Sequence, residues 1–153
     1  MTKPLHILLA DDDSDDRFFF EKAIKLASTP SFLTTVDNGE RLMQFLTTTT
    51  DELPDALFLD LNMPRKNGSE CLREIKMHEK LNALPVIIYS TSLHVEIADL
   101  LYKAGAYYYI KKTNLLELQK FLDHVLSMLS NGKLTRPSRE QFILNSKIYD
   151  NSK

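Results

Sequence analysis

The stretch LFLDLNMP, Leu57–Pro64, decides how the rest of the chain is understood. Its apolar residues run without interruption as far as Leu59, and a single carboxylate, Asp60, follows them directly. An uninterrupted apolar run of this length is typical of a strand that is buried on both faces, as in a parallel sheet. Asn62 and Pro64 then favour a turn. The stretch therefore predicts a central strand that carries one acid at its carboxyl end.

Apolar runs of this kind alternate with segments of helical spacing along the chain. This alternation indicates β-α units, and we expect a flavodoxin-like, doubly wound, three-layer α/β/α fold. Its parallel sheet would have five strands in the order 2-1-3-4-5. The predicted strands are Leu5–Ala10, Phe32–Val36, Ala56–Leu59, Val86–Tyr89 and Ala106–Ile110. The predicted helices are Asp15–Ala27, Glu40–Thr47, Ser69–Met77, Val95–Lys103 and Leu115–Leu129.

The composition fits one globular domain. The chain has 153 residues, of which 43% are hydrophobic and 26% charged, enough for one buried core. A net charge of −2 argues against a generally basic nucleic-acid binder, so we expect no direct binding to DNA. The single cysteine, Cys71, excludes an internal disulfide and is expected to be structural. No apolar run is long enough to cross a bilayer and no signal-peptide pattern is present, so we expect a cytoplasmic protein.

Polar residues follow four of the predicted strands. Open α/β sheets bind ligands at the carboxyl ends of their strands, and the first, third, fourth and fifth strands are neighbours in the predicted order. We therefore expect the residues that follow these strands to converge on one pocket. They are Asp11, Asp12 and Asp13, then Asp60, then Ser90 and Thr91, and finally Lys111 and Lys112.

The chemistry of this pocket indicates phosphoryl transfer. Several carboxylates close together repel one another, and a divalent cation such as Mg²⁺ removes that conflict. A lysine and a hydroxyl group stabilise the negative charge of a phosphoryl group. The sequence has no glycine-rich phosphate loop and no base placed to activate a serine. The combination predicts a carboxylate nucleophile that accepts a phosphoryl group as an acyl phosphate, and Asp60 is the candidate.

The chain resembles the receiver domain of two-component response regulators over about residues 3–130. The resemblance lies in the order and spacing of four stretches, which makes it more specific than any single motif. They are ILLADDD (Ile7–Asp13), LFLDLNMP (Leu57–Pro64), VIIYSTS (Val86–Ser92) and GAYYYIKK (Gly105–Lys112). Within the family, the chain is similar to the stand-alone, CheY-like receivers that serve phytochrome-type and other histidine kinases.

The resemblance implies a role for each acidic residue of the pocket. Asp60 would be the phosphoacceptor. Asp12 would bind Mg²⁺ directly together with Asp60, and Asp11 would act mainly through metal-bound water. Asn62 would offer its backbone carbonyl to the metal.

The resemblance also implies how the pocket contacts the phosphoryl group. Ser90 and Lys112 would bind the phosphoryl oxygens, and Tyr109 would be a rotamer switch. Thr91 occupies a position where bulk affects the access of water. The family usually has a proline after the lysine, whereas this chain has Thr113. A cis bond before a non-proline residue costs about 2.5–4 kcal/mol, so the sequence leaves open whether the Lys112–Thr113 bond is cis or trans.

The acids that follow Asp12 are expected to begin the first helix. Asp13, Ser14, Asp15 and Asp16 would act as cap residues, because the helix dipole favours negative charge there. A calcium-binding EF-hand loop is excluded. Its sixth and twelfth positions would require Gly and Glu, and here they are Asp16 and Lys22.

Phe18 is a candidate for partner docking. Phe20, Ala23, Ile24 and Ala27 define the buried face of the first helix, and Phe18 points away from it. We expect Phe18 to belong to an exposed apolar patch where the phosphodonor histidine domain of receivers docks. The alternative is a ring that lies flat on its own surface.

We expect residues 1–130 to form the receiver domain and residues 131–153 to form a C-terminal extension without an output domain. The extension contains Phe142, Ile143, Ile148 and Tyr149 and is expected to form a short helix. Three arrangements stay open: the extension packs back on the receiver, pairs two protomers as a homodimer, or remains mobile.

The predicted function is that of a single-domain response regulator. A sensor histidine kinase or histidine phosphotransfer protein would phosphorylate Asp60, and the signal would pass to an unidentified downstream protein in a phosphorelay. The chain would assist only its own phosphorylation and dephosphorylation, so it would not be an enzyme. One alternative is a scaffold that binds proteins without phosphorylation. Another is a Mg²⁺-dependent aspartyl phosphatase, which usually has a second acid where this chain has Asn62.

Overall fold

The computed structural model describes residues 3–49 and 52–144. Its strands are β1 (Leu5–Ala10), β2 (Ser31–Val36), β3 (Ala56–Leu59), β4 (Val86–Ser90), β5 (Tyr108–Lys111) and β6 (Ile143–Leu144). Its helices are α1 (Ser14–Leu26), α2 (Gly39–Thr48), α3 (Gly68–Met77), α4 (Val95–Lys103) and α5 (Leu115–Ser130), and η1 (Arg139–Gln141) is a short 3₁₀ helix. None of the helices described is long and apolar enough to cross a membrane.

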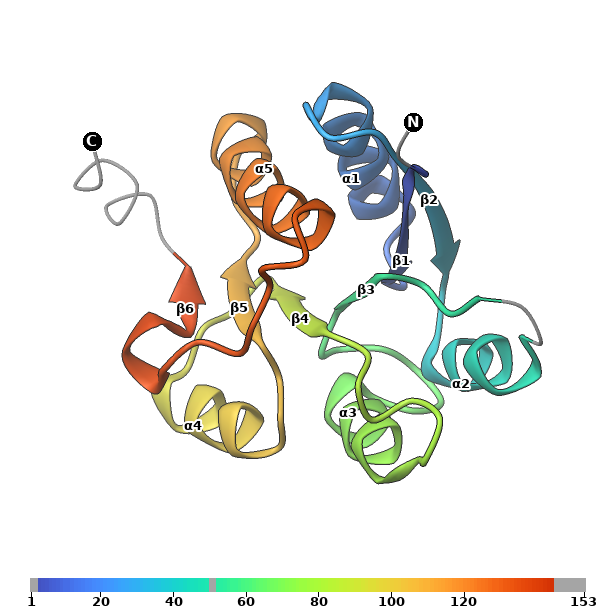
Figure 1. Ribbon diagram of the computed structural model, residues 1–153. Coiled ribbons are helices and arrows are strands. Elements are labelled where there is room, and N and C mark those ends of the chain that lie inside the picture. The colour runs from blue at the N-terminus through green and yellow to red at the C-terminus, as the bar shows by residue number, and fades with distance from the viewer. Residues whose placement is uncertain (1–2, 50–51, 145–153) are drawn as a thin grey trace.

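The strands form one parallel sheet in the order β2-β1-β3-β4-β5-β6. Helices α1 and α5 cover one face, and α2, α3 and α4 cover the other (Figure 1). The flavodoxin-like fold and the order of the first five strands are confirmed. In β1, Ile7 faces α1 and α5, and the next residue, Leu8, faces the other three helices. Both faces of the strand are buried, so its sequence is apolar from Ile7 to Ala10.

The prediction of five strands was wrong, because β6 adds a sixth strand at the edge of β5. Ile143 pairs with Tyr109, and Leu144 pairs with Ile110. The tail was expected to form a short helix, but its described part forms the 3₁₀ helix η1 followed by this strand. β6 has only two residues, so no alternation of apolar and polar positions could reveal it. Within the described residues, the tail packs back on the receiver, and Ile148 and Tyr149 lie outside them.

The register of the strands brings the polar residues together. Ala10 of β1 lies opposite Leu59 of β3, so the residues that follow them, Asp11 and Asp60, are neighbours. Ser90 of β4 lies opposite Lys111 of β5, which places Lys112 one residue beyond. The carboxyl ends of β1, β3, β4 and β5 therefore meet at one edge of the sheet, as the sequence predicts.

Candidate functional site

Three carboxylates meet at the carboxyl ends of β1 and β3. Asp11 is 0% exposed and Asp60 is 5% exposed, whereas Asp12 lies at the exposed rim. Each of the three offers an oxygen atom, and these oxygens all lie within 4.8 Å of one another. The backbone N–H of Asp60 donates a hydrogen bond of 3.0 Å to the carbonyl of Ala10, which fixes the two strand ends side by side. The all-oxygen donor set fits a hard divalent cation such as Mg²⁺.

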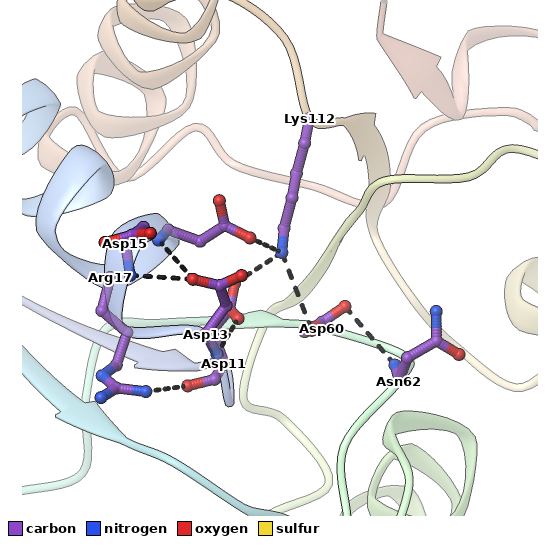
Figure 2. Close-up of polar contacts among 8 residues, drawn as sticks. Asp11, Asp13, Asp15, Arg17, Asp60, Asn62 and Lys112 are labelled. Carbon is purple, nitrogen blue, oxygen red and sulfur yellow. Dashed lines mark hydrogen bonds and ion pairs between the residues drawn. The ribbon is translucent and has the colours of Figure 1, made fainter.

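Lys112 reaches into this cluster from the end of β5 (Figure 2). Its Nζ lies 2.7 Å from Oδ2 of Asp11 and 3.7 Å from Oδ2 of Asp60. The Lys112 side chain is only 10% exposed, whereas Lys111 points to solvent, as alternation along a strand predicts. The structure has no cis peptide bond among the residues described, so the Lys112–Thr113 bond is trans. Lys112 therefore reaches the acids without the cis bond that is usual before proline in the family.

Burial and charge together set the protonation of these groups. Burial raises the pKa of Asp60 to about 6, the charge of Lys112 opposes this rise, and the charge of Asp11 adds to it. Burial also raises the pKa of Asp11. Burial acts to lower the pKa of Lys112, but its hydrogen bonds with Asp11 and Asp16 outweigh this and hold that pKa above its usual value. The lysine therefore stays charged, and a bound cation would favour the ionised form of the buried carboxylates.

The loop that carries Asp60 packs tightly against the start of α3. The backbone N–H of Asn62 lies 3.4 Å from Oδ1 of Asp60, a long hydrogen bond, and the N–H of Gly68 donates to the carbonyl of Leu61 at 3.0 Å. A Cβ atom at Gly68 would lie 2.3 Å from the backbone oxygen of Asp60, so only glycine fits there. Asn62 stands beside Asp60 on this loop, at the position for which the resemblance implies a backbone metal ligand (Figure 2).

The predicted switch residues lie at the ends of β4 and β5. The Ser90 side chain is buried, and its hydrogen bond with Tyr109 opposes the rise that burial causes in the pKa of Tyr109. The next residue, Thr91, is exposed. Tyr109 is 1% exposed, and its hydroxyl group donates to the carbonyl of Ser92. The predicted rotamer switch therefore points inward in this structure.

The structure brings to the site two residues, Asp16 and Arg17, for which the sequence predicted no role there. Oδ2 of Asp16 lies 2.8 Å from Nζ of Lys112, and the guanidinium group of Arg17 donates to the carbonyl of Asp11 at 2.8 Å. The sequence indicated that Asp16 is only a cap residue, but the cap itself is Asp13, which accepts hydrogen bonds from the backbone at the helix start. Helical side chains lean toward the helix N-terminus, so an acid in the first turn of α1 leans toward the pocket. That direction is the signal that could have identified Asp16.

Phe18 is exposed, as its position on the helix predicts. It is 65% exposed, whereas Phe20, Ala23 and Ile24 are buried. Nζ of Lys22 lies 5.5 Å from the centre of the Phe18 ring, within the range of a cation–π contact. Phe18 and Lys22 therefore form a small surface that is both apolar and basic.

Comparisons with known proteins identify the family. The family model of the response regulator receiver domain matches residues 7–123. Response regulator Rcp1 from Synechocystis sp. is 30% identical over 129 residues, which cover 81% of this chain and 88% of Rcp1. Two-component response regulator ARR17 from Arabidopsis thaliana is 29% identical over 140 residues, which cover 85% of this chain and 90% of ARR17.

Solved structures agree with the sequence comparisons. The phosphorylated cyanobacterial phytochrome response regulator RcpA has a TM-score of 0.76 and 29% identity, covering 89% of this chain and 100% of that structure. The Mn²⁺-bound form of Rcp1 has a TM-score of 0.74 and 28% identity, covering 88% of this chain and 100% of that structure. The matched residues 7–123 include Asp11, Asp12, Asp60 and Lys112. The chain therefore belongs to the response regulator receiver family.

Proposed function

We propose that the chain is a single-domain response regulator that accepts a phosphoryl group on Asp60 from a histidine kinase or a histidine phosphotransfer protein. One observation carries the proposal. Asp60 stands at the end of the central strand with two more carboxylates within 4.8 Å, and the ammonium group of Lys112 lies 3.7 Å from it. Residues 1–130 would be the receiver and residues 131–153 a C-terminal extension, of which the described part, up to Leu144, packs on the receiver.

The residues of the site divide the chemistry among them. Asp11, Asp12 and Asp60 would hold Mg²⁺, which supplies positive charge to the phosphoryl oxygens when it is bound. A carboxylate oxygen of Asp60 attacks phosphorus, and the phosphorus–nitrogen bond of the donor phosphohistidine breaks as the new oxygen–phosphorus bond forms. The hydroxyl group of Ser90, buried at the end of β4, would donate a hydrogen bond to a phosphoryl oxygen.

The new negative charge then changes the surface near β5. Lys112 and Ser90 move toward the phosphoryl group, and Tyr109 changes its rotamer. The result is a shift in population between two states of the surface formed by α4, β5 and α5. The signal passes to a downstream protein through this surface. The protein acts in the cytoplasm and catalyses only its own phosphorylation and dephosphorylation.

Phe18 would help to bind the phosphodonor. Its exposed ring lies on α1, the helix whose first turn contributes Asp16 to the pocket. A histidine domain that docks on this ring would bring its phosphohistidine to the edge of the sheet where Asp60 lies.

The proposal is tested by measuring intact mass after incubation with acetyl phosphate, with and without Mg²⁺. A gain of one phosphoryl group that requires Mg²⁺ is expected for the wild type and not for Asp60→Asn. If neither acetyl phosphate nor a native histidine kinase labels Asp60, the protein is a scaffold that binds its partners without phosphorylation.

A further inference from the structure

Lys112 has two close carboxylate partners and one distant one. Its Nζ lies 2.7 Å from Asp11 and 2.8 Å from Asp16, both within hydrogen-bond distance. The distance to Oδ2 of Asp60 is 3.7 Å, which is too long for a hydrogen bond. The lysine is thus held on the α1 side of the pocket, where it forms its two close contacts, and it forms only a long ion pair with the predicted phosphoacceptor.

The two close partners differ in their setting. Asp11 belongs to the core and is completely buried, whereas the Asp16 side chain lies at the rim and is 33% exposed. Asp16 is held in place by the helix start, where the side chain of Asp13 accepts hydrogen bonds from the backbone N–H groups of Asp15 and Asp16. The Lys112 side chain is 10% exposed, so its ion pair with Asp16 is better shielded from water than an ordinary surface pair.

Removing the Asp16 carboxylate would leave Asp11 and Asp60 as the nearest anions to Lys112. The ammonium group would then move toward Asp60, because the negative charge of Asp16 would no longer attract it toward α1. An ammonium group bound to Asp60 competes with a divalent cation for the same oxygens. It is also already in place for an incoming phosphoryl group.

We propose that Asp16 is a positioning residue that holds Lys112 away from Asp60 before phosphorylation. In doing so it leaves Asp60 open to the metal ion, and it competes with the phosphoryl group for the lysine. The part of this inference that concerns phosphoryl transfer rests on the proposed function. The part that concerns metal binding rests only on the acidic cluster and the two ion pairs.

The chain provides a matched control in Asp15. It lies one residue before Asp16 in the same turn of α1 and is exposed. Within the described structure its carboxylate has no ion pair or hydrogen bond with Lys112. Asp15→Asn and Asp16→Asn remove the same charge from the same helix end, so a difference between them reports the contact with Lys112.

The first measurement is Mg²⁺ affinity by isothermal titration calorimetry of the full chain. Asp16→Asn should weaken Mg²⁺ binding by about 3- to 10-fold, and Asp15→Asn by less than about 2-fold. Asp16→Asn is then repeated in a Lys112→Met background. If Asp16 acts through the lysine, its effect disappears there. An equal loss of affinity in both backgrounds would mean that Asp16 contributes only its own charge, and the proposal would be overturned.

The second measurement is the rate of labelling by acetyl phosphate at saturating Mg²⁺. Asp16→Asn should be labelled faster than Asp15→Asn, by about 3-fold, because the released lysine is available to the phosphoryl group. Weaker metal binding together with faster labelling is a pattern that simple damage to the fold would not produce. Slower labelling of Asp16→Asn overturns the competition with the phosphoryl group. If the wild type takes no label, the proposed function fails, and the calorimetric comparison still decides the role of Asp16.

Discussion

The backbone N–H of Tyr109 donates a hydrogen bond of 3.0 Å to the carbonyl of Phe142. The C-terminal tail therefore joins the sheet at the residue that is the predicted switch. The Phe142 ring is completely buried, and it meets the ring of Tyr109 edge to face with 6.3 Å between their centres. Side chains of α4 hold the same segment, since Asp99 pairs with Arg139 at 2.6 Å and Tyr102 donates to the carbonyl of Pro137 at 2.7 Å.

We predict that Phe142→Ala destabilises the whole domain. Truncating a buried phenylalanine costs about 3–5 kcal/mol when the surrounding structure stays in place. Because the tail can detach instead of leaving a cavity, we expect a loss at the lower end of this range, about 3 kcal/mol in the free energy of unfolding. Denaturation in urea measures it, with Gln141→Ala as the control because Gln141 is the exposed neighbour. Equal stability of the two variants would mean that the tail contributes little to the fold.

The raised pKa of Asp60 predicts how stability depends on pH without metal ions. This pKa rises from 3.8 to about 6 on folding, so the folded state holds the proton more tightly than the unfolded state. The free energy of unfolding should therefore fall as pH rises through this interval, by about 3 kcal/mol from this group. Asp60→Asn cannot ionise and escapes this loss.

Thermal unfolding in a metal chelator tests the pH prediction. Asp60→Asn should unfold at a higher temperature than the wild type at about pH 7.5, and the difference should shrink toward about pH 4.5. Added Mg²⁺ should raise the unfolding temperature of the wild type more than that of Asp60→Asn, because it binds the ionised carboxylate. A difference between the two proteins that does not change with pH would contradict the raised pKa.

The sequence predicts the strands that are long enough to show as apolar runs, and it predicts the site residues that directly follow those strands. The apolar runs predict five strands, the doubly wound topology predicts their order, and parallel pairing then places Asp11 and Asp60 side by side. Two features escape such reasoning. β6 has only two residues, and only its contacts with β5 and the burial of Phe142 define it. The position of Asp16 in the first turn of α1 indicates only that its side chain leans toward the pocket, and its contact with Lys112 is seen only in the structure.

If Phe18 docks the phosphodonor, its replacement should change phosphoryl transfer from the histidine domain and leave labelling by acetyl phosphate unchanged. Phe18→Ala should slow phosphoryl transfer from the cognate histidine domain by about 10-fold, because an exposed aromatic ring contributes to binding when it is buried at an interface. Labelling by acetyl phosphate, which needs no docking surface, should not change. Met77→Ala is the matched control, since Met77 is another exposed apolar residue and lies on α3. Equal slowing with both donors would remove the docking role.

Gly68 should control the position of Asp60 through the backbone. A methyl group there would meet the backbone oxygen of Asp60 at 2.3 Å and the Cα of Leu61 at 2.8 Å. Both contacts are backbone atoms that no side-chain rotation can relieve, so Gly68→Ala must displace either the loop or the start of α3. Because a shift of about 1 Å in a reacting group can cost about 100-fold in rate, labelling of Asp60 by acetyl phosphate should fall by more than about 10-fold. Ser69→Ala is the control at the adjacent position. A Gly68→Ala variant that loses stability but is labelled at the normal rate would contradict this role of Gly68.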